Sequence, residues 1–251
     1  MNGSFLVPEW HAPAGVAALS TTRRGGVSRA PYDDGEGGGG LNLGAHVGDD
    51  PDSVRANRAL LRTRLPDEPA WLSQVHGNRV VHADSAVDAP QADASITSRR
   101  GVVCAIQTAD CLPVLFCDVA ATVVGAAHAG WRGLAGGVLQ NTVGAMRTAG
   151  ARDIIAWLGP AIGPRRFEVG QDVVKAFCAQ SPGLRSAFVP REAVPGKHLA
   201  DIYALARMIL AEAGVRQVFG GGRCTVEESR DFYSYRRDGV TGRMASLIWL
   251  K

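Results

Sequence analysis

Two short apolar segments, 112–117 and 122–127, limit the folds open to this chain. Each is too short for a typical helix and is rich in aliphatic or β-branched residues, so each predicts a buried strand. The connection between them has the length of a hairpin loop, which favours antiparallel pairing. Cys111 precedes the first strand and His128 follows the second. We therefore expect Cys111 and His128 to lie at the same end of one sheet.

The rest of the pattern alternates further short strands with helices. Strands are predicted at 14–20, 71–76, 80–82, 102–107, 154–158, 215–220 and 245–250. Helices are predicted at 52–65, 131–149, 171–180 and 199–213. No linker or repeat interrupts this order, so residues 1–251 are expected to form one α+β domain. The glycine-rich run 33–40 is expected to be a mobile insertion in this domain.

Composition excludes several classes of protein. With 46% hydrophobic residues the chain can bury a sizeable core, and no apolar run is long enough to span a bilayer. Residues 1–13 lack the basic-then-apolar pattern of a secretory signal, so a cytoplasmic protein without membrane contact is expected. The net charge of +3, with no basic stripe and interleaved aromatics, argues against a nucleic-acid partner. Five irregularly spaced cysteines argue against a disulfide framework.

The candidate site combines Cys111 and His128 with His76, which lies in a Gln-Val-His-Gly segment. A catalytic zinc commonly uses three protein ligands and leaves its fourth position to water, and two histidines with one cysteine fit that set. Zinc would lower the pKa of bound water to roughly 7. The spacing alone is a weak signal, because 35 and 17 residues separate the three side chains. Other histidines could compete for the role, namely 11, 46, 82 and 198.

Two other interpretations use the same residues. Cys111 could be a nucleophile with His128 as its base, and the N-terminus of the helix predicted from Trp131 would lower the thiol pKa. Alternatively, both side chains could be core packing. The glycine-rich and polar sequences around Cys111 and His128 are unusual for a core, which counts against this last interpretation.

The chain also resembles a known family along nearly its whole length. The similar segments occur in the family's order, at 21–28, 41–44, 47–50, 57–58, 74–77, 92–94, 108–114, 128–133, 158–163, 167–170 and 233–243. They are typical of the YfiH-like or laccase-domain family, also called multicopper polyphenol oxidase-like proteins and described as purine nucleoside phosphorylases. The run 33–40 makes the loop before Leu41 longer than is usual for this family.

The resemblance implies a single domain with mixed or antiparallel sheets sandwiched between helices, related to a group of cysteine hydrolases. It places a metal, usually zinc and possibly copper, on His76, Cys111 and His128. It implies phosphorolysis of adenosine, inosine, guanosine and methylthioadenosine, with adenosine deamination, and an older assignment is polyphenol oxidation. Six scattered histidines do not supply a multicopper set, so polyphenol oxidation is disfavoured. A structural zinc in a non-catalytic binding protein is the remaining alternative.

Purine nucleosides and phosphate are thus the expected partners, bound by a monomer or small homo-oligomer. Guanidinium groups match phosphate geometry, which makes Arg23, Arg132 and Arg236 candidates for binding phosphate. Asp110 and Glu168 are candidates for proton transfer, and the sequence alone does not place either within reach of a substrate. Two polar residues of the segments that resemble the family are further candidates for contacting substrate, namely Ser28 and Asn42.

Overall fold

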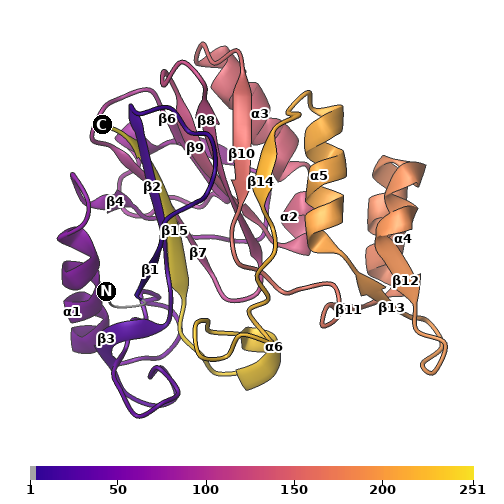
Figure 1. Cartoon of the computed structure of the whole chain (residues 1–251), viewed down its shortest axis with the longest axis horizontal. Coiled ribbons are helices and arrows are strands. Elements are labelled where there is room, and N and C mark those ends of the chain that lie inside the picture. Colours follow the sequence, from indigo (N-terminus) through magenta and orange to yellow (C-terminus); the bar gives the residue numbers. More distant parts are fainter. Residues whose placement is uncertain (1–3) are drawn as a thin grey trace.

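Two β-sheets stack face to face in the computed structural model, which describes residues 4–251 (Figure 1). The five-stranded sheet has the order β1-β2-β15-β7-β4, and the six-stranded sheet has the order β14-β10-β8-β9-β6-β5. The first sheet consists of β1 (Phe5–Leu6), β2 (Val16–Thr21), β4 (Pro69–Ala70), β7 (Val103–Thr108) and β15 (Met244–Leu250). The second consists of β5 (Val80–His82), β6 (Ala94–Thr97), β8 (Leu112–Asp118), β9 (Val124–Ala129), β10 (Ile154–Leu158) and β14 (Val218–Gly220).

The alternation of side chains along β8 explains the stacking. Leu115 and Cys117 face the five-stranded sheet and pack in a core that includes Ile106 and Ile248. The residues of β8 that alternate with them face the other way, because successive strand side chains point to opposite sides. Phe116, for example, packs in a core built with the helices. Both faces of β8 are therefore buried, which accounts for its continuous apolar sequence.

Helices cover the two outer faces of this pair of sheets (Figure 1). Leu61 of α1 (Pro51–Arg62) packs with Leu247 against the five-stranded sheet. The six-stranded sheet is covered by α3 (Val138–Thr148) and α5 (Ile202–Glu212), with α4 (Gln171–Gln180) beside them. The fold is therefore a mixed α/β sandwich with helices on both sides, as the sequence and the resemblance predicted.

Smaller elements complete the chain. They are β3 (Arg24–Ser28), η1 (Ala83–Ser85), α2 (Trp131–Ala135), β11 (Glu168–Gly170), η2 (Pro182–Ala187), β12 (Phe188–Pro190), β13 (Lys197–Ala200) and α6 (Tyr235–Asp238). The three strands β11, β13 and β12 form a separate small sheet. This sheet and α4 extend from one side of the molecule (Figure 1).

The prediction of a strand at 71–76 is wrong. Apart from one bridge between Ser73 and Gln91, this segment makes no ladder among the described residues. Its end turns sharply at His76, whose φ is 60°. The carboxylate of Asp93 accepts hydrogen bonds from the backbone of Val75, His76 and Gly77. These bonds to a side chain replace the bonds that a strand would make.

The helix predicted at 131–149 is interrupted, and two others begin elsewhere than expected. The chain forms α2 and α3, separated by Gly136 and by Gly137 with φ 91°. The helix expected at 199 begins at 202, because Asp201 caps it and the preceding residues belong to β13. Likewise α1 begins at Pro51, one residue after its cap Asp50, since proline suits the first helical position.

The glycine-rich run 33–40 is described throughout, and local hydrogen bonds order part of it. The Asp34 carboxylate accepts from the backbone of Glu36 and Gly38, and Glu36 pairs with Arg230. Its mobility stays a prediction. Within residues 4–251, no helix combines the length and the apolar character needed to cross a membrane.

Gly137 provides a test of why the long helix breaks. A methyl group added at Gly137 would meet only Gln140 at 3.8 Å, so there is room for it, but φ 91° strains any residue with a Cβ. We expect Gly137→Ala to destabilise the fold by about 1–2 kcal/mol. Gly144, inside α3 and equally open, is the matched control. Gly144→Ala should stabilise by about 0.5–1 kcal/mol. Urea unfolding measures both; equal effects would contradict this explanation.

Candidate metal centre and adjoining pockets

His76, Cys111 and His128 come together at one end of the β8–β9 hairpin. Each offers one ligand atom, and these atoms all lie within 4.8 Å of one another. The Cys111 Sγ lies 3.8 Å from His76 Nε2. The two strands pair antiparallel, with Pro113 opposite His128. The predicted meeting of Cys111 and His128 is therefore present, and the loop that follows β4 adds His76.

Asp93 holds two of these three residues in place. Its carboxylate is fully buried, and Oδ1 lies 2.8 Å from His128 Nδ1. The same carboxylate accepts hydrogen bonds from the backbone of Val75, His76 and Gly77. Burial raises the pKa of Asp93, but these partners outweigh burial and the net shift is downward. Asp93 therefore stays ionised, and it leaves His128 Nε2 free to face the centre.

Asp110 fixes the backbone next to Cys111. Its φ is 89°, and its carboxylate accepts hydrogen bonds from the Thr225 hydroxyl at 2.5 Å and from the Arg236 backbone at 2.6 Å. The strained conformation is thus held by two partners far away in the chain. Asp110 thus lies directly before Cys111 in the chain, with both carboxylate oxygens engaged in hydrogen bonds to the protein, and its part in proton transfer stays a prediction.

The three side chains fit a metal ion with two nitrogen ligands and one sulfur ligand. Bond lengths of about 2.0–2.3 Å at tetrahedral angles put neighbouring ligand atoms roughly 3.5 Å apart, close to the 3.8 Å between Cys111 and His76. Gly130 leaves the space that this requires. A Cβ at this position would lie 2.9 Å from Cys111 Sγ, 3.0 Å from His76 Cδ2 and 3.5 Å from His128 Nε2.

Electrostatics favour the ligand form of Cys111. Burial raises the pKa of its thiol, but the neighbouring His128 and His76 outweigh burial and lower the pKa to about 6. Burial lowers the pKa of His128, whereas Cys111 and Asp93 raise it to about 9. Without a metal, a thiolate therefore faces an imidazolium. The same arrangement is a Cys–His–Asp constellation, so the geometry supports both a metal centre and a cysteine nucleophile.

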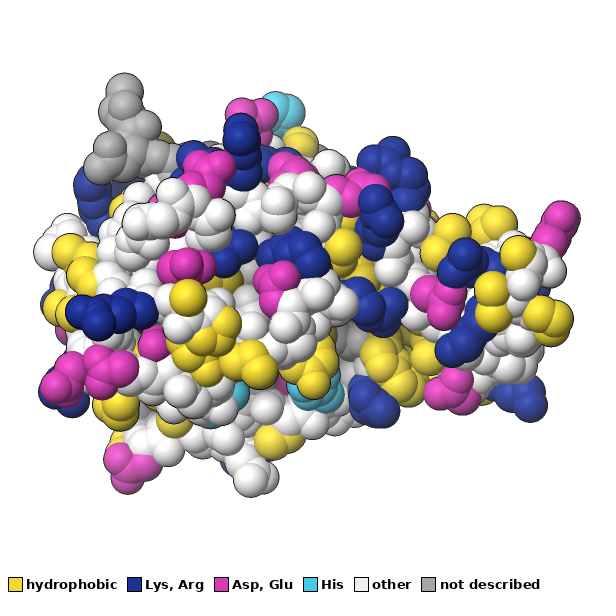
Figure 2. Space-filling model, turned by 90° about the horizontal axis from the view of Figure 1, so that it is seen from below, with side chains coloured by type: hydrophobic (Ala, Val, Ile, Leu, Met, Phe, Trp, Pro, Cys, Tyr) yellow, Lys and Arg dark blue, Asp and Glu magenta, His cyan; other side chains and the backbone are white. Residues whose placement is uncertain are grey.

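Two pockets meet at Cys111. The first, here called the polar pocket, has a volume of about 410 Å³, and its lining includes His46, Gln74, His76, Gln107, Cys111, His128, Tyr235 and Arg243. The second, here called the aromatic pocket, has a volume of about 260 Å³, and its lining includes Asp110, Cys111, Trp131, Arg132, Ile162, Phe167, Ile202, Tyr235 and Arg236. Cys111 and Tyr235 line both pockets. The end of the molecule that carries α6 also exposes histidine, hydrophobic and cationic side chains (Figure 2).

Of the residues predicted to bind substrate, only two line these pockets. Arg132 and Arg236 line the aromatic pocket, where they stack over Trp131 and Phe167 respectively. Arg236 also donates to the backbone carbonyls of Arg166 and Glu168. The helix whose N-terminus was expected to point its dipole at the site is the five-residue α2. Its dipole is much weaker than that of the predicted 131–149 helix, so its effect on the Cys111 thiol is correspondingly small.

Apart from Asp110, the other residues predicted to contact substrate or transfer protons line neither pocket, and their polar atoms bond to the protein. Arg23 is buried and donates to the carbonyls of Asp33 and Ser229. The Ser28 hydroxyl donates to the Asp49 carboxylate, and the side-chain oxygen of Asn42 accepts from the backbone N–H of Arg243. The Glu168 carboxylate pairs with Arg191 and lines neither pocket. Asn42 therefore does not line the site itself, but its side chain holds the backbone of Arg243, which does.

Sequence reasoning missed the roles of Asp93, Gln107 and Arg243. Asp93 and Arg243 lie in segments that resemble the family, at 92–94 and 241–243, which was the available signal. Burial leaves Arg243 short of water and lowers the pKa of its guanidinium. Gln107 lies within β7, and the sequence carried no signal for it, because only its side-chain oxygen, which has no hydrogen-bond partner among the described residues, sets it apart.

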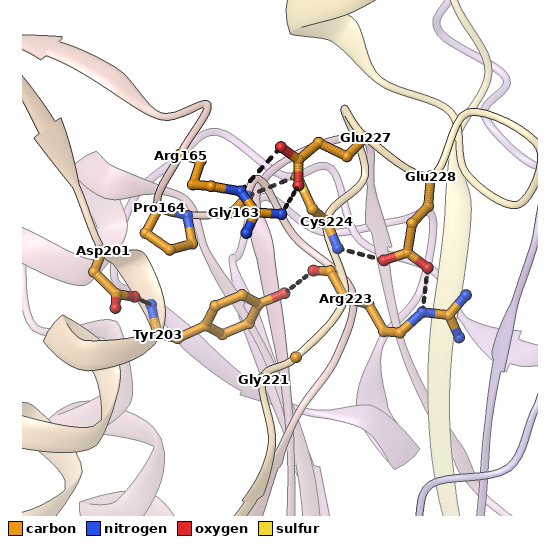
Figure 3. Close-up of a pocket in the computed structure, with 11 residues that line it drawn as sticks. Gly163, Pro164, Arg165, Asp201, Tyr203, Gly221, Arg223, Cys224, Glu227 and Glu228 are labelled. Carbon is orange, nitrogen blue, oxygen red and sulfur yellow. Dashed lines mark hydrogen bonds and ion pairs between the residues drawn. The ribbon is translucent and has the colours of Figure 1, made fainter.

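A larger cavity of about 530 Å³ lies elsewhere (Figure 3). Its charged side chains are satisfied by one another or by the backbone. Arg165 pairs with Glu227, Arg223 pairs with Glu228, and Asp201 caps α5. Because its charges already have partners, this cavity has a weaker claim to a charged ligand than the pockets at Cys111.

Comparison with known proteins agrees with this architecture. The model of a family described as multi-copper polyphenol oxidoreductase laccase matches residues 17–251. A Pseudomonas aeruginosa protein named purine nucleoside phosphorylase is 55% identical over 248 residues, which cover 99% of each chain. Escherichia coli YfiH, which carries the same name, is 54% identical over 98% of each chain. A crystal structure of a Neisseria meningitidis protein superposes with a TM-score of 0.91 at 54% identity, covering 99% of each chain.

The sandwich fold and the His-Cys-His group define a protein of the laccase-domain class. The chain belongs to the YfiH-like family, whose model spans all but the first 16 residues. The family resemblance inferred from the sequence is therefore confirmed.

Asp93→Asn tests whether this carboxylate positions the metal ligands. An amide cannot accept all four hydrogen bonds, so we expect metal affinity to fall by about 10–100-fold. Asp88→Asn, a neutralisation at an exposed residue outside both pockets, should leave affinity unchanged. Competition with a chelator, followed by elemental analysis of the protein, measures the affinity. Unchanged affinity in Asp93→Asn, with the protein folded by circular dichroism, would refute the assigned role.

Proposed function

We propose that this protein is a metal-dependent purine nucleoside phosphorylase, with zinc on His76, Cys111 and His128. The observation that carries the proposal is the meeting of a polar and an aromatic pocket at Cys111. Phosphorolysis joins a small polyanion to a nucleoside with an apolar, planar base, so it needs two unlike compartments that share one reacting centre. The names of the P. aeruginosa and E. coli relatives support this reaction.

In the proposed reaction a phosphate oxygen forms a bond to C1′ of the ribose as the bond from C1′ to N9 breaks. The electron pair of the broken bond leaves with the purine, which takes up a proton. A bound zinc would supply a positive charge close to the reacting groups. Asp93 orients His128, while Arg132 and Arg236 line the aromatic pocket, whose walls suit the planar base. The aromatic walls exclude water from the base.

Two observations bear on the competing functions. Polyphenol oxidation by several copper ions is disfavoured, because residues 4–251 contain a single cluster of three or more potential ligands. A cysteine hydrolase is the second candidate, since Cys111 lies beside His128 and His128 beside Asp93. The two candidates differ in whether turnover requires the metal.

The proposal is tested by mass-spectrometric analysis of the products from adenosine, with and without inorganic phosphate. We expect adenine and ribose 1-phosphate, only when phosphate is present. Cys111→Ala should reduce turnover to background and lose the metal, whereas Cys178→Ala, which alters a cysteine outside both pockets, should retain both.

The alternatives predict different results in the same experiment. Inosine as the only product would make the protein a deaminase. Adenine with free ribose, independent of phosphate and of chelators, would favour the cysteine hydrolase. Turnover that is lost on chelation and restored by zinc would favour the metal centre. No product from any purine nucleoside would refute the proposed function.

A further inference from the structure

The polar pocket contains a cation without a carboxylate partner. Arg243 is half-buried and forms no ion pair with any residue from 4 to 251. Within residues 4–251 its side chain donates hydrogen bonds only from Nη1, to the carbonyls of Thr241 and Gly242. No aspartate or glutamate is among the residues that line this pocket. A guanidinium with spare donors in such a place is complementary to an anion.

The same pocket also contains an acceptor without a donor. Gln74 and Gln107 are neighbours, but their side chains differ in use. Gln74 is fully engaged, since its amide bonds to both the backbone N–H and the carbonyl of Gln107. The side-chain oxygen of Gln107 is buried and has no hydrogen-bond partner among the described residues. A buried acceptor left unpaired is costly, so this oxygen calls for a donor from a ligand.

Inorganic phosphate satisfies both groups. Its ionised oxygens can accept from the Arg243 guanidinium, and the one hydroxyl of the dianion can donate to Gln107. His46 also lines the pocket. Burial, followed by the charges of Arg243 and Arg58, lowers the pKa of His46, which is consistent with a net positive environment.

The aromatic pocket has the opposite character. Trp131, Phe167, Ile162 and Ile202 give it apolar walls. Its two arginines lie over aromatic rings, and the guanidinium of Arg236 is also engaged with backbone carbonyls. Asp110 also lines this pocket, and its negative charge would oppose a polyanion. A planar, uncharged base fits these walls better than phosphate does.

Building on the proposed function, we propose that phosphate binds in the polar pocket, with Arg243 as its anion-binding residue and Gln107 as a hydrogen-bond acceptor. The purine then lies in the aromatic pocket, and the ribose crosses the junction at Cys111 and Tyr235. This assignment places the phosphate away from Arg132 and Arg236, two of the three arginines that the sequence suggested for it, and Arg23, the third, lines neither pocket.

The proposal is tested by titrating inorganic phosphate into the metal-loaded protein in a calorimeter, with no nucleoside present. Loss of a charged hydrogen bond costs about 10–100-fold in affinity, which is the weakening expected for Arg243→Gln. Arg243→Lys, which keeps the charge, should lose less. Arg132→Gln should leave the phosphate dissociation constant within about twofold, because Arg132 lies in the other pocket.

A second pair of variants tests Gln107 with less risk to the charge balance of the fold. Gln107→Leu should weaken phosphate binding by about 3–10-fold, the effect of one neutral hydrogen bond. Gln140 is the matched control, because its side-chain oxygen is also buried without a partner but lies outside both pockets. Gln140→Leu should leave phosphate binding unchanged. Thermal melting establishes that each variant is folded.

The outcomes separate this inference from the proposed function. Phosphate binding that depends on Arg243 and Gln107 supports the subsite even if no phosphorolysis occurs, in which case only the proposed function fails. Binding lost in Arg132→Gln but kept in Arg243→Gln would overturn the subsite while phosphorolysis stands. Absence of any phosphate binding by the unmutated protein would overturn it as well. In steady-state kinetics, Arg243→Lys should raise the KM for phosphate and leave the KM for the nucleoside nearly unchanged.

Discussion

The carboxylate of Asp93 is the interaction on which the candidate site depends. A buried charge is stable only when hydrogen bonds replace the water that it has lost. Asp93 obtains three of these bonds from the backbone of the loop that ends at Gly77, and one from the ring of His128. One ionised group thereby sets both the path of the His76 loop and the orientation of the His128 ring. Two of the three potential ligands would lose their relative positions without it.

The features that local sequence controls were predictable. The hairpin 112–127 follows from two apolar runs and a short connection, and it places Cys111 and His128 as observed. The segment 71–76 was not predictable, because a carboxylate 17 residues beyond His76 determines its conformation. The break between α2 and α3 depends on the left-handed backbone of Gly137. A glycine within a helical pattern does not by itself predict a left-handed backbone.

The residues of the candidate site were likewise predictable only in part. Residue types and the family resemblance were enough to select His76, Cys111 and His128. Arg23, Ser28 and Asn42 also lie in segments that resemble the family, yet their polar atoms bond to the protein itself. Only the three-dimensional arrangement distinguishes a polar group that supports a loop from one that awaits a ligand. Gln74 and Gln107 illustrate this. They are the same residue type and lie in contact, but the side-chain amide of Gln74 is hydrogen-bonded to the protein, whereas the side-chain oxygen of Gln107 has no partner among the described residues.

The position of Cys111 between the two sheets has a thermodynamic consequence. The chain leaves the five-stranded sheet at Thr108 and enters the six-stranded sheet at Leu112, so Cys111 lies on the seam. His76 lies in the loop that runs from β4 of the first sheet to β5 of the second, whereas His128 belongs to β9 of the second. An ion held by all three would cross-link the two layers. Its binding free energy would then add to the cohesion of the sandwich by mass action, coupling the integrity of the fold to the supply of metal.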